Sequence, residues 1–254
     1  MHRSALPDGT RVIIKQRRDV PPDFFRAEAR GLAALRDARA LRVPEMFEVE
    51  DDRIVLEDLG HGQRASDYWQ CAGAGLARQH SVSRKRFGFE HDGFCGDSPQ
   101  SNTPDEDGWR FFAERRLLPQ MHRARDAGLI DARDSAAIES LCANLRERVP
   151  EMPPVLLHGD LWSGNLHVCA DGGPALIDAG AVHFGWAEAE LAMLILFGAP
   201  PPAFFDAYAG HAPLRQDWRA RAPLYNLYHL MNHVNLFGAG YVSALRAALA
   251  ACAW

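Results

Sequence analysis

The stretch that decides the fold of this chain is residues 155–167, which read VLLHGDLWSGNLH. A short apolar run ends in a turn that carries Asp160, and Asn165 follows five residues later. A second apolar run, residues 175–177, ends directly before another carboxylate, Asp178. Short apolar runs bounded by turn residues are typical of β-strands. We therefore expect these three side chains to emerge from neighbouring strand ends and to share one site.

Two carboxylates and one amide are the groups that phosphoryl transfer needs. One carboxylate, Asp160, would accept the proton of a substrate hydroxyl, while Asn165 and Asp178 would hold Mg²⁺ against nucleotide phosphates. The spacing from Asp160 to Asn165 equals that in the catalytic loop of protein kinases. Alternatively, Asp160 is a turn or helix-cap carboxylate and Asn165 a turn residue. Their joint placement between two strand-like runs favours the catalytic interpretation.

The first 59 residues are predicted to form a small β-rich lobe with one helix. The expected strands are 11–15, 45–50 and 53–59, and the expected helix is 23–36, with a first hairpin arm within 1–6. Lys15 ends a strand that reads VIIK, similar to the kinase strand whose lysine contacts the nucleotide phosphates. Glu28 lies on the helix and is placed to pair with Lys15, because a buried ammonium needs such a partner. Alternatively, both side chains are solvated.

Residues 60–254 are predicted to form a larger, mostly helical lobe after the glycine-containing turn 60–63. The expected helices are 66–81, 107–128, 131–149, 188–197, 203–208, 217–237 and 240–251, with strand-like stretches at 155–158, 166–169 and 175–178. The expected fold class is therefore α+β in two lobes, with domains 1–59 and 60–254.

Composition and charge exclude several classes of protein. The 254 residues are 47% hydrophobic and 24% charged, which is ordinary for a globular chain of one or two domains. The net charge of −5 argues against a nucleic-acid or anionic-membrane partner. The most apolar run, 191–205, is broken by prolines, so no membrane span is expected. Five widely spaced cysteines without a C-x-x-C pair indicate reduced thiols in a cytoplasmic protein, rather than disulfides or structural zinc.

The loop at residues 158–165 resembles that of the fructosamine kinases (ketosamine-3-kinases), in the aminoglycoside-phosphotransferase branch of the protein-kinase-like fold. The wider branch typically reads HGDLH there, whereas Trp162-Ser163 is similar to the fructosamine subgroup. The resemblance covers nearly the whole chain. Further similar blocks lie within 87–89, 96–102, 109–117, 185–198 and 228–238.

The resemblance implies ATP-dependent phosphorylation of the O3′ hydroxyl of a fructosamine, which is a ketosamine adduct on a lysine or a free amine. It implies that Asp160 is the catalytic base and that Asn165 and Asp178 bind Mg²⁺. It also implies that Lys15 and Glu28 position the phosphates of ATP. The implied cofactors are ATP and Mg²⁺, and the implied partner is a small-molecule or protein-bound ketosamine. The expected state is a monomer or a weak homodimer.

The resemblance also implies three further binding roles. The backbone from Glu57 to Leu59 would be the adenine hinge. Trp162 would be a platform for the sugar, because sugar faces rich in C–H groups pack on aromatic rings; a loop anchor is the alternative. His233 and Asn232 could reach the substrate, although packing and hydrogen bonding are the favoured roles for residues on a C-terminal helix.

The sequence departs from the family pattern at several supporting positions. Ala179-Gly180 stands where Pro-Ala is usual, and Trp186-Ala187 where His or Asp is followed by Arg. Glu190 stands where Asp is usual, and Gly93 where Asn is usual. The three central chemical residues are retained.

A glycine-rich hairpin over the phosphates would be expected before the turn at 7–9, yet no glycine precedes Gly9. We therefore expect a chain truncated at the N-terminus that lacks the first strand and the glycine-rich loop. Two alternative functions stay open at this point. One is a small-molecule kinase for another hydroxyl, of the aminoglycoside or choline type, and the other is a degenerate, non-catalytic nucleotide-binding module.

Overall fold

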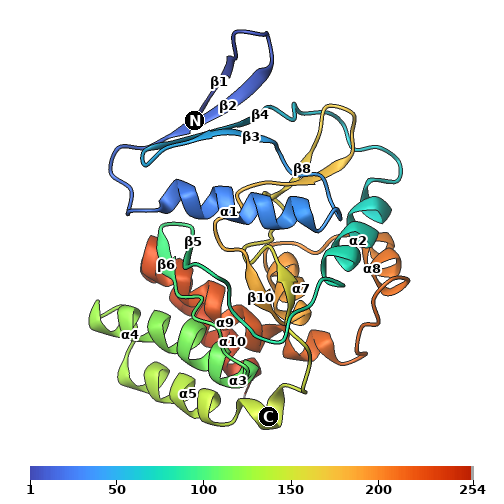
Figure 1. Ribbon diagram of the computed structural model, residues 1–254. Coiled ribbons are helices and arrows are strands. Elements are labelled where there is room, and N and C mark those ends of the chain that lie inside the picture. The colour runs from blue at the N-terminus through green and yellow to red at the C-terminus, as the bar shows by residue number, and fades with distance from the viewer. Residues whose placement is uncertain (253–254) are drawn as a thin grey trace.

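The computed structural model describes residues 1–252. A four-stranded antiparallel sheet and helix α1 (Phe24–Asp37) lie above a larger helical part (Figure 1). The strands are β1 (His2–Ala5), β2 (Arg11–Gln16), β3 (Met46–Val49) and β4 (Arg53–Glu57), in the spatial order β1-β2-β4-β3. All the strands expected here form, including the short first hairpin arm. The proposed boundary after Leu59 falls in the stretch that connects β4 to α2.

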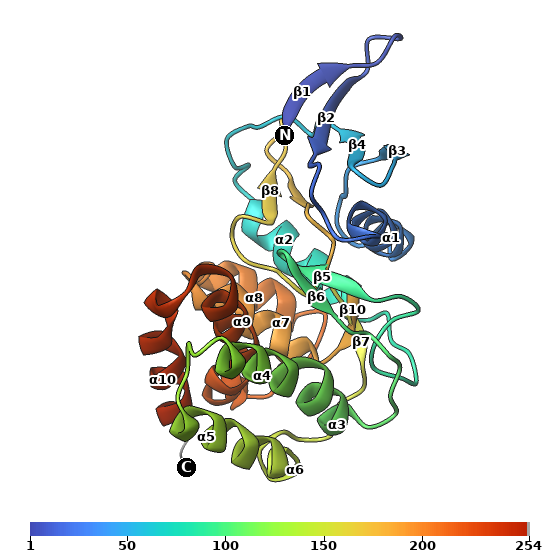
Figure 2. The same ribbon diagram turned by 90° about the vertical axis from the view of Figure 1, so that its left-hand side faces the viewer.

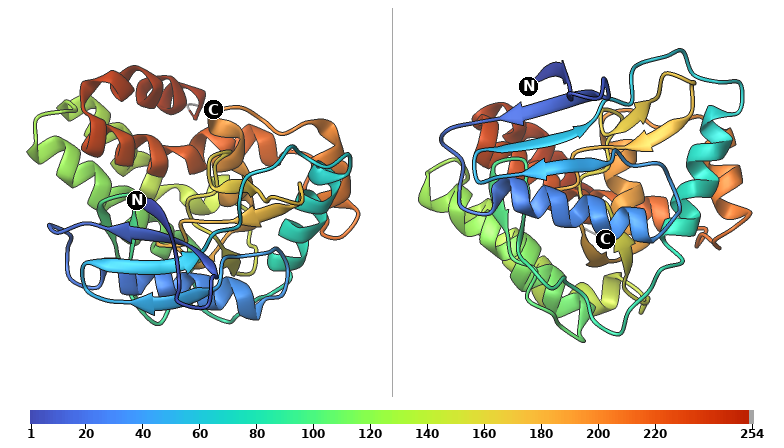
Figure 3. Two further views of the ribbon diagram at one scale, coloured as in Figure 1. Left: turned by 90° about the horizontal axis from the view of Figure 1, so that it is seen from above. Right: turned by 45° about the horizontal axis from the view of Figure 1, so that its top comes forward.

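Helix α1 packs beneath the sheet because its apolar residues recur at helical spacing. Phe25, Leu32 and Leu35 are each at most 2% exposed and face Ile54 and Leu56 of β4 in one core cluster. Seen from above, the strands run over α1 in roughly the direction of its axis (Figure 3), and Figure 2 looks almost along that axis. The helix therefore has a fixed position under the strand that carries Lys15.

The larger part is mostly helical, as expected. Its α-helices are α2 (Tyr68–Gln79), α3 (Gly108–Phe112), α4 (Leu118–Asp126), α5 (Ala132–Ala143), α6 (Leu145–Arg148), α7 (Ala187–Leu196), α8 (Pro202–Ala209), α9 (Trp218–Phe237) and α10 (Val242–Ala251). A π-helical turn, Ala113–Leu117, joins α3 to α4, and a 3₁₀ turn, Ala239–Tyr241, precedes α10. The segment expected as one helix over 131–149 divides at Asn144, between α5 and α6.

Three two-stranded sheets accompany these helices. They are β5 (Gly93–Cys95) with β6 (Ser98–Gln100), β7 (Val155–Leu157) with β10 (His183–Gly185), and β8 (Leu166–Val168) with β9 (Pro174–Leu176). The strands β7, β8 and β9 were expected to lie side by side. This was wrong for β7, which pairs with β10. The strands β5, β6 and β10 were not expected, because each is only three residues long and lacks β-branched residues.

One core cluster joins the sheet and α1 to the helical part. It contains Leu32 and Leu56 together with Leu156, Phe184 and Leu191, which belong to β7, β10 and α7. A second cluster, around Leu117, Met121 and Val234, fills the space among the lower helices. Because the first cluster is continuous, β2, α1 and the loop after β7 are held against one another. Among the described helices, none combines the length and apolarity that crossing a bilayer requires.

Candidate active site

A cleft of about 400 Å³ opens between the sheet with α1 and the loop that follows β7. Six of the predicted site residues line it: Lys15, Glu28, Asp160, Trp162, Asn165 and Asp178. Other residues that line it include Arg17, Phe24, Phe94 and Asp97. The other three predicted residues, Glu57, Leu59 and His233, are not among the residues that line this cleft.

The turn after β7 is possible only because residue 159 is glycine. Gly159 has φ = 84°, and a Cβ at this position would lie 2.0 Å from the carbonyl oxygen of Ala181. On the preceding residue, Nε2 of His158 lies 2.8 Å from the carbonyl oxygen of Ile177, in the segment that leads to Asp178. The sharp turn and this contact place the side chain of Asp160 at the cleft.

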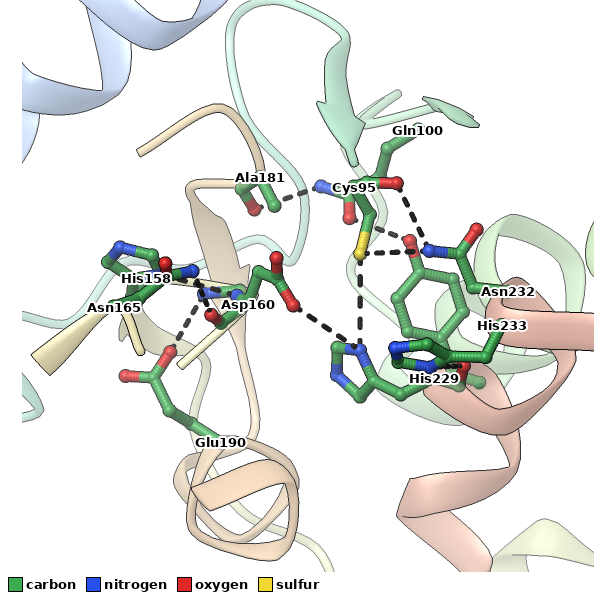
Figure 4. A network of polar contacts seen from close by, with 12 residues as sticks. Cys95, Gln100, His158, Asp160, Asn165, Ala181, Glu190, His229, Asn232 and His233 are labelled. Carbon is green, nitrogen blue, oxygen red and sulfur yellow. Dashed lines mark hydrogen bonds and ion pairs between the residues drawn. The ribbon is translucent and has the colours of Figure 1, made fainter. Parts of the chain in front are cut away.

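A buried carboxylate fixes the backbone of the same turn. The N–H of Gly159 donates to Oε1 of Glu190 on α7 at 2.8 Å (Figure 4). Oε2 of Glu190 lies 3.0 Å from Nε2 of His80 and accepts a bond of 3.3 Å from Gln79. Glu190 is 2% exposed, so these contacts are shielded from water. The longer side chain at this position, where Asp is usual, still reaches the loop.

Asp160 has the electrostatics of a proton acceptor near neutral pH. Burial, opposed by a hydrogen bond with Cys95 and reinforced by the Glu190 carboxylate, raises the pKa of Asp160 to about 7. A general base works best when its pKa lies near the operating pH. The position and the pKa of this carboxyl group therefore both suit the abstraction of a hydroxyl proton.

Asn165 and Asp178 present oxygen ligands to the same cleft. Nδ2 of Asn165 donates to the carbonyl oxygen of Asp160 at 2.8 Å, which leaves the amide oxygen on the other branch of the side chain. Asp178 follows β9 with φ = 60°, a left-handed conformation that Asp tolerates better than most residues. Its side chain is 49% exposed. Amide and carboxylate oxygens are the ligands that Mg²⁺ takes, so this pair could hold that ion.

Lys15 lies between two carboxylates at the back of the cleft. Its Nζ is 2.5 Å from Oε1 of Glu28, so the pair predicted from the sequence forms. Nζ also contacts Oδ1 of Asp178, which the sequence analysis did not anticipate. The approach of α1 makes this possible, because a Cβ at Gly31 would lie 1.8 Å from the carbonyl oxygen of Ala179. One cation thus connects β2, α1 and Asp178, the second residue after β9.

Two of the departures from the family pattern contact each other. The N–H of Phe94 donates to the carbonyl oxygen of Gly180 at 2.9 Å. A Cβ at Gly93 would lie 2.5 Å from that oxygen. The small residue at 93 therefore lets β5 pack directly against the segment that follows Asp178.

The backbone groups of the predicted hinge are partly used within the protein. The N–H of Glu57 donates to the carbonyl oxygen of Glu45 at 2.8 Å, and the carbonyl oxygen of Leu59 accepts from Ala170 at 2.9 Å. Leu59 is buried with Cys169 and Ala175 in a small apolar cluster. An adenine ring at this position would therefore have to use the carbonyl group of Glu57 and the N–H of Leu59.

The two predicted substrate residues differ in their surroundings. The Trp162 side chain is 41% exposed and lines the cleft, with its ring over Gly164, where a Cβ would lie 2.4 Å from the ring. His233 is half-buried on α9, and its Nδ1 donates to the carbonyl oxygen of His229 at 2.6 Å. The His233 ring stacks on Tyr241 with 5.0 Å between centroids. The substrate role of His233 stays a prediction.

Comparisons with known proteins show the family to which this chain belongs. Residues 4–253 match the sequence model of the family described as fructosamine kinase. The chain belongs to the fructosamine kinase family. It is 37% identical over 235 residues to a probable ketoamine kinase of Synechocystis. The aligned region covers 90% of this chain and 78% of that relative. It is 34% identical over 247 residues to a chloroplastic protein-ribulosamine 3-kinase of Arabidopsis thaliana, covering 93% and 74% of the two chains.

A solved structure from Thermobifida fusca, assigned as a fructosamine-3-kinase, has the same fold. It superposes with a TM-score of 0.90 at 36% identity, covering 98% of this chain and 88% of that one. This member of the fructosamine kinase family thus has the protein-kinase-like fold and is an ATP-dependent phosphotransferase. The degenerate, non-catalytic alternative is set aside.

Sequence reasoning missed two residues beside Asp160 in this fructosamine kinase family member. Nδ1 of His229 lies 4.0 Å from Oδ1 of Asp160 and 3.9 Å from Sγ of Cys95 (Figure 4). Burial lowers the pKa of His229 to about 3 and raises the pKa of Cys95 well above its usual value, so both are neutral at pH 7. The spacing of these residues along the chain carries no motif, although His229 lies within one of the blocks that resemble the family.

Proposed function

We propose that this chain transfers the γ-phosphoryl group of ATP to the O3′ hydroxyl of a ketosamine, which is either free or attached to a protein lysine. The observation that carries the proposal is the arrangement of Lys15, Asp160, Asn165 and Asp178 around one cleft in a fructosamine kinase family member. The name of the Arabidopsis relative, a protein-ribulosamine 3-kinase, supports the choice of the 3-hydroxyl and of protein-bound substrates.

Asp160 is the proposed catalytic base. As the O3′ oxygen attacks the γ-phosphorus, its proton moves to the Asp160 carboxylate and the bond to the ADP oxygen breaks. Glu190 and Asn165 hold this residue from both sides, through the Gly159 N–H and the Asp160 carbonyl oxygen. Such positioning is what a phosphoryl-transfer site mainly provides.

Asn165 and Asp178 are the proposed ligands of Mg²⁺, which when bound neutralises phosphate charge. Lys15 is the proposed partner of the nucleotide phosphates, with Glu28 fixing its ammonium group. Because Asp178 contacts Lys15, its proposed role requires that it exchange this ammonium group for Mg²⁺ when nucleotide binds. All of these groups line the cleft, so a single nucleotide pose would serve them.

We propose the remaining binding roles because the family resemblance suggests them. Glu57 and Leu59 provide the adenine hinge, Trp162 is the sugar platform, and His233 contacts the substrate farther along α9. We also propose a cytoplasmic location, which suits the five free thiols, and a monomer or weak homodimer.

A turnover assay tests this function. ATP consumption is measured with fructosyl-lysine, ribulosyl-lysine and kanamycin, and the phosphorylated position of the product is determined by NMR. We expect turnover on a ketosamine, phosphate at O3′, and a loss of at least about 1000-fold in kcat for Asp160→Asn, a loss in the range of removing a positioned base. Turnover only on kanamycin would instead identify a kinase for another hydroxyl.

The matched control is Asp206→Asn, which changes an exposed carboxylate on α8. It should keep wild-type turnover. Thermal unfolding and ATP affinity of Asp160→Asn should stay close to wild type, because the replacement is nearly isosteric. An Asp160→Asn enzyme that keeps its kcat would refute the assignment of the base.

A further inference from the structure

Three side chains from separate elements meet beside the floor of the cleft. Cys95 is the last residue of β5, Asp160 follows β7, and His229 lies in the middle of α9. One ligand atom from each, Sγ, a carboxylate oxygen and Nδ1, lies within 4.8 Å of the other two (Figure 4). Two of the three separations are 3.9 Å from Sγ to Nδ1 and 4.0 Å from Nδ1 to Oδ1.

We propose that Cys95, Asp160 and His229 form a binding site for a thiophilic divalent cation, of which Zn²⁺ is the type. Ligand bond lengths of about 2.3 Å to sulfur and about 2.0 Å to nitrogen place two tetrahedral ligands about 3.5 Å apart. The Sγ–Nδ1 and Nδ1–Oδ1 separations exceed this by about half an ångström, so a bound ion would draw the three side chains together by small rotations. Thiolate, imidazole and carboxylate each bind Zn²⁺, and three protein ligands with an open fourth position are the arrangement of catalytic zinc sites.

The chemistry of these ligands separates this site from the proposed magnesium site. Mg²⁺ takes oxygen ligands in an octahedral arrangement, which Asn165 and Asp178 can supply. A cysteine sulfur and a histidine nitrogen favour Zn²⁺ over Mg²⁺. Asp160 belongs to the proposed zinc set and lies between the two sites.

The surroundings of Cys95 support a bound thiolate. Nδ2 of Asn232, one turn beyond His229 on α9, donates to the Cys95 carbonyl oxygen at 3.1 Å and to Sγ at 3.3 Å. Such a donor orients the sulfur and stabilises negative charge on it. Metal binding would release the thiol proton to solvent and form the S–Zn bond, so charge and protons balance without an added reactant.

The site has both an enclosed side and an entrance. Cys95 and His229 are 2% and 6% exposed, whereas Asp160 lines the open cleft. A cation can therefore enter from the cleft, and a water molecule can take the fourth position. Because zinc would occupy the carboxylate of the proposed base, bound Zn²⁺ would inhibit phosphoryl transfer. This consequence, unlike the binding itself, rests on the proposed function.

Binding is tested with Co²⁺ as a spectroscopic probe for zinc in the full chain. We expect a thiolate-to-cobalt charge-transfer band that saturates at one equivalent and disappears when Zn²⁺ is added. The band should be lost in Cys95→Ser and kept in Cys71→Ser, which removes an exposed thiol on α2. His229→Gln should weaken Co²⁺ affinity at least tenfold, which gives a second variant should Cys95→Ser fail to fold. Absence of the band in wild type, its persistence in folded Cys95→Ser, or an unchanged Co²⁺ affinity in His229→Gln would each overturn the proposal.

Inhibition is tested separately, with buffered free Zn²⁺ and an excess of Mg²⁺ and ATP. We expect Zn²⁺ to reduce ketosamine turnover, a zinc-selective chelator to restore it, and Cys71→Ser to behave like wild type. If the chain shows no turnover even without zinc, the proposed function fails while the cobalt band still decides the metal site. If turnover is normal and Zn²⁺ binds at Cys95 without inhibiting, Asp160 is not a ligand and the three-residue site is refuted.

Discussion

The backbone N–H of Gly159 donates a hydrogen bond of 2.8 Å to the buried carboxylate of Glu190. The residue directly before the proposed base is thereby attached to α7. The same carboxylate contacts His80 and Gln79 of the region around α2, so one acidic side chain connects three segments. The position of Asp160 therefore depends on a side chain that lies outside the cleft.

Glu190→Gln should reduce both stability and turnover. The substitution replaces one carboxylate oxygen, which accepts hydrogen bonds, by an NH₂ group, which donates them. This NH₂ group would face the N–H donors that now bond to the oxygen, so at least one buried hydrogen bond is lost. Buried hydrogen bonds to charged groups contribute about 1.5–3 kcal/mol. We expect a similar loss in the free energy of unfolding, measured with urea, and a lower kcat with little change in KM. Glu139→Gln, an exposed residue of α5, is the control, and equal behaviour of the two variants would contradict this role.

Glu28→Gln should weaken ATP binding. Without this carboxylate, the Lys15 ammonium keeps only its contact with the half-exposed Asp178 and loses its fixed position. Loss of a charge-assisted hydrogen bond worth about 1.5–3 kcal/mol corresponds to a decrease of roughly 10- to 150-fold in the affinity for ATP. The measurement is titration calorimetry with ATP, with Glu45→Gln, an exposed residue of the same lobe, as control. Unchanged ATP affinity in Glu28→Gln would show that Lys15 does not depend on the pair.

Gly31→Ala should disturb the contact between α1 and the segment after Asp178. The added Cβ would lie 1.8 Å from the carbonyl oxygen of Ala179, and that backbone group cannot rotate away. Overpacking of this kind costs about 1–3 kcal/mol. We expect a comparable loss in the free energy of unfolding and a lower kcat, because Asp178 and Lys15 shift together. Gly240→Ala meets nothing within 4 Å and should keep wild-type stability and turnover; a neutral Gly31→Ala would disprove the close approach.

Stability should fall as the pH drops below about 6.5, the usual pKa of histidine. Burial, with the charge of Arg116, lowers the pKa of His183 well below that value in the folded chain. Below pH 6.5 the unfolded chain therefore binds a proton that the folded chain excludes, so protonation favours unfolding. His183→Gln should make the decline in unfolding free energy between pH 6.5 and 5 shallower. The exposed His122→Gln should leave the slope unchanged, and identical slopes in both variants would refute this cause.

Sequence reasoning was most successful where the chemistry is local. Asp160, Asn165 and the carboxylate after the next strand are specified by short apolar runs and turns, and the structure places all three at one cleft. The pairing of β7 was predicted wrongly because its partner, β10, is only three residues long. Strands of that length have no alternation to detect, and tertiary packing alone selects their neighbours.

The sequence by itself determined the kinase-like order of elements and the groups for phosphoryl transfer, because periodicity, turns and motif spacing are properties of neighbouring residues. Only the tertiary structure decided that Lys15 contacts Asp178 as well as Glu28, and that Glu190 holds the turn before Asp160. It alone also brought Cys95 and His229 to the proposed base. The physical reason is that these contacts join elements far apart in the chain, and their geometry is set by how the shared hydrophobic core packs α1, α7, β5 and α9 together.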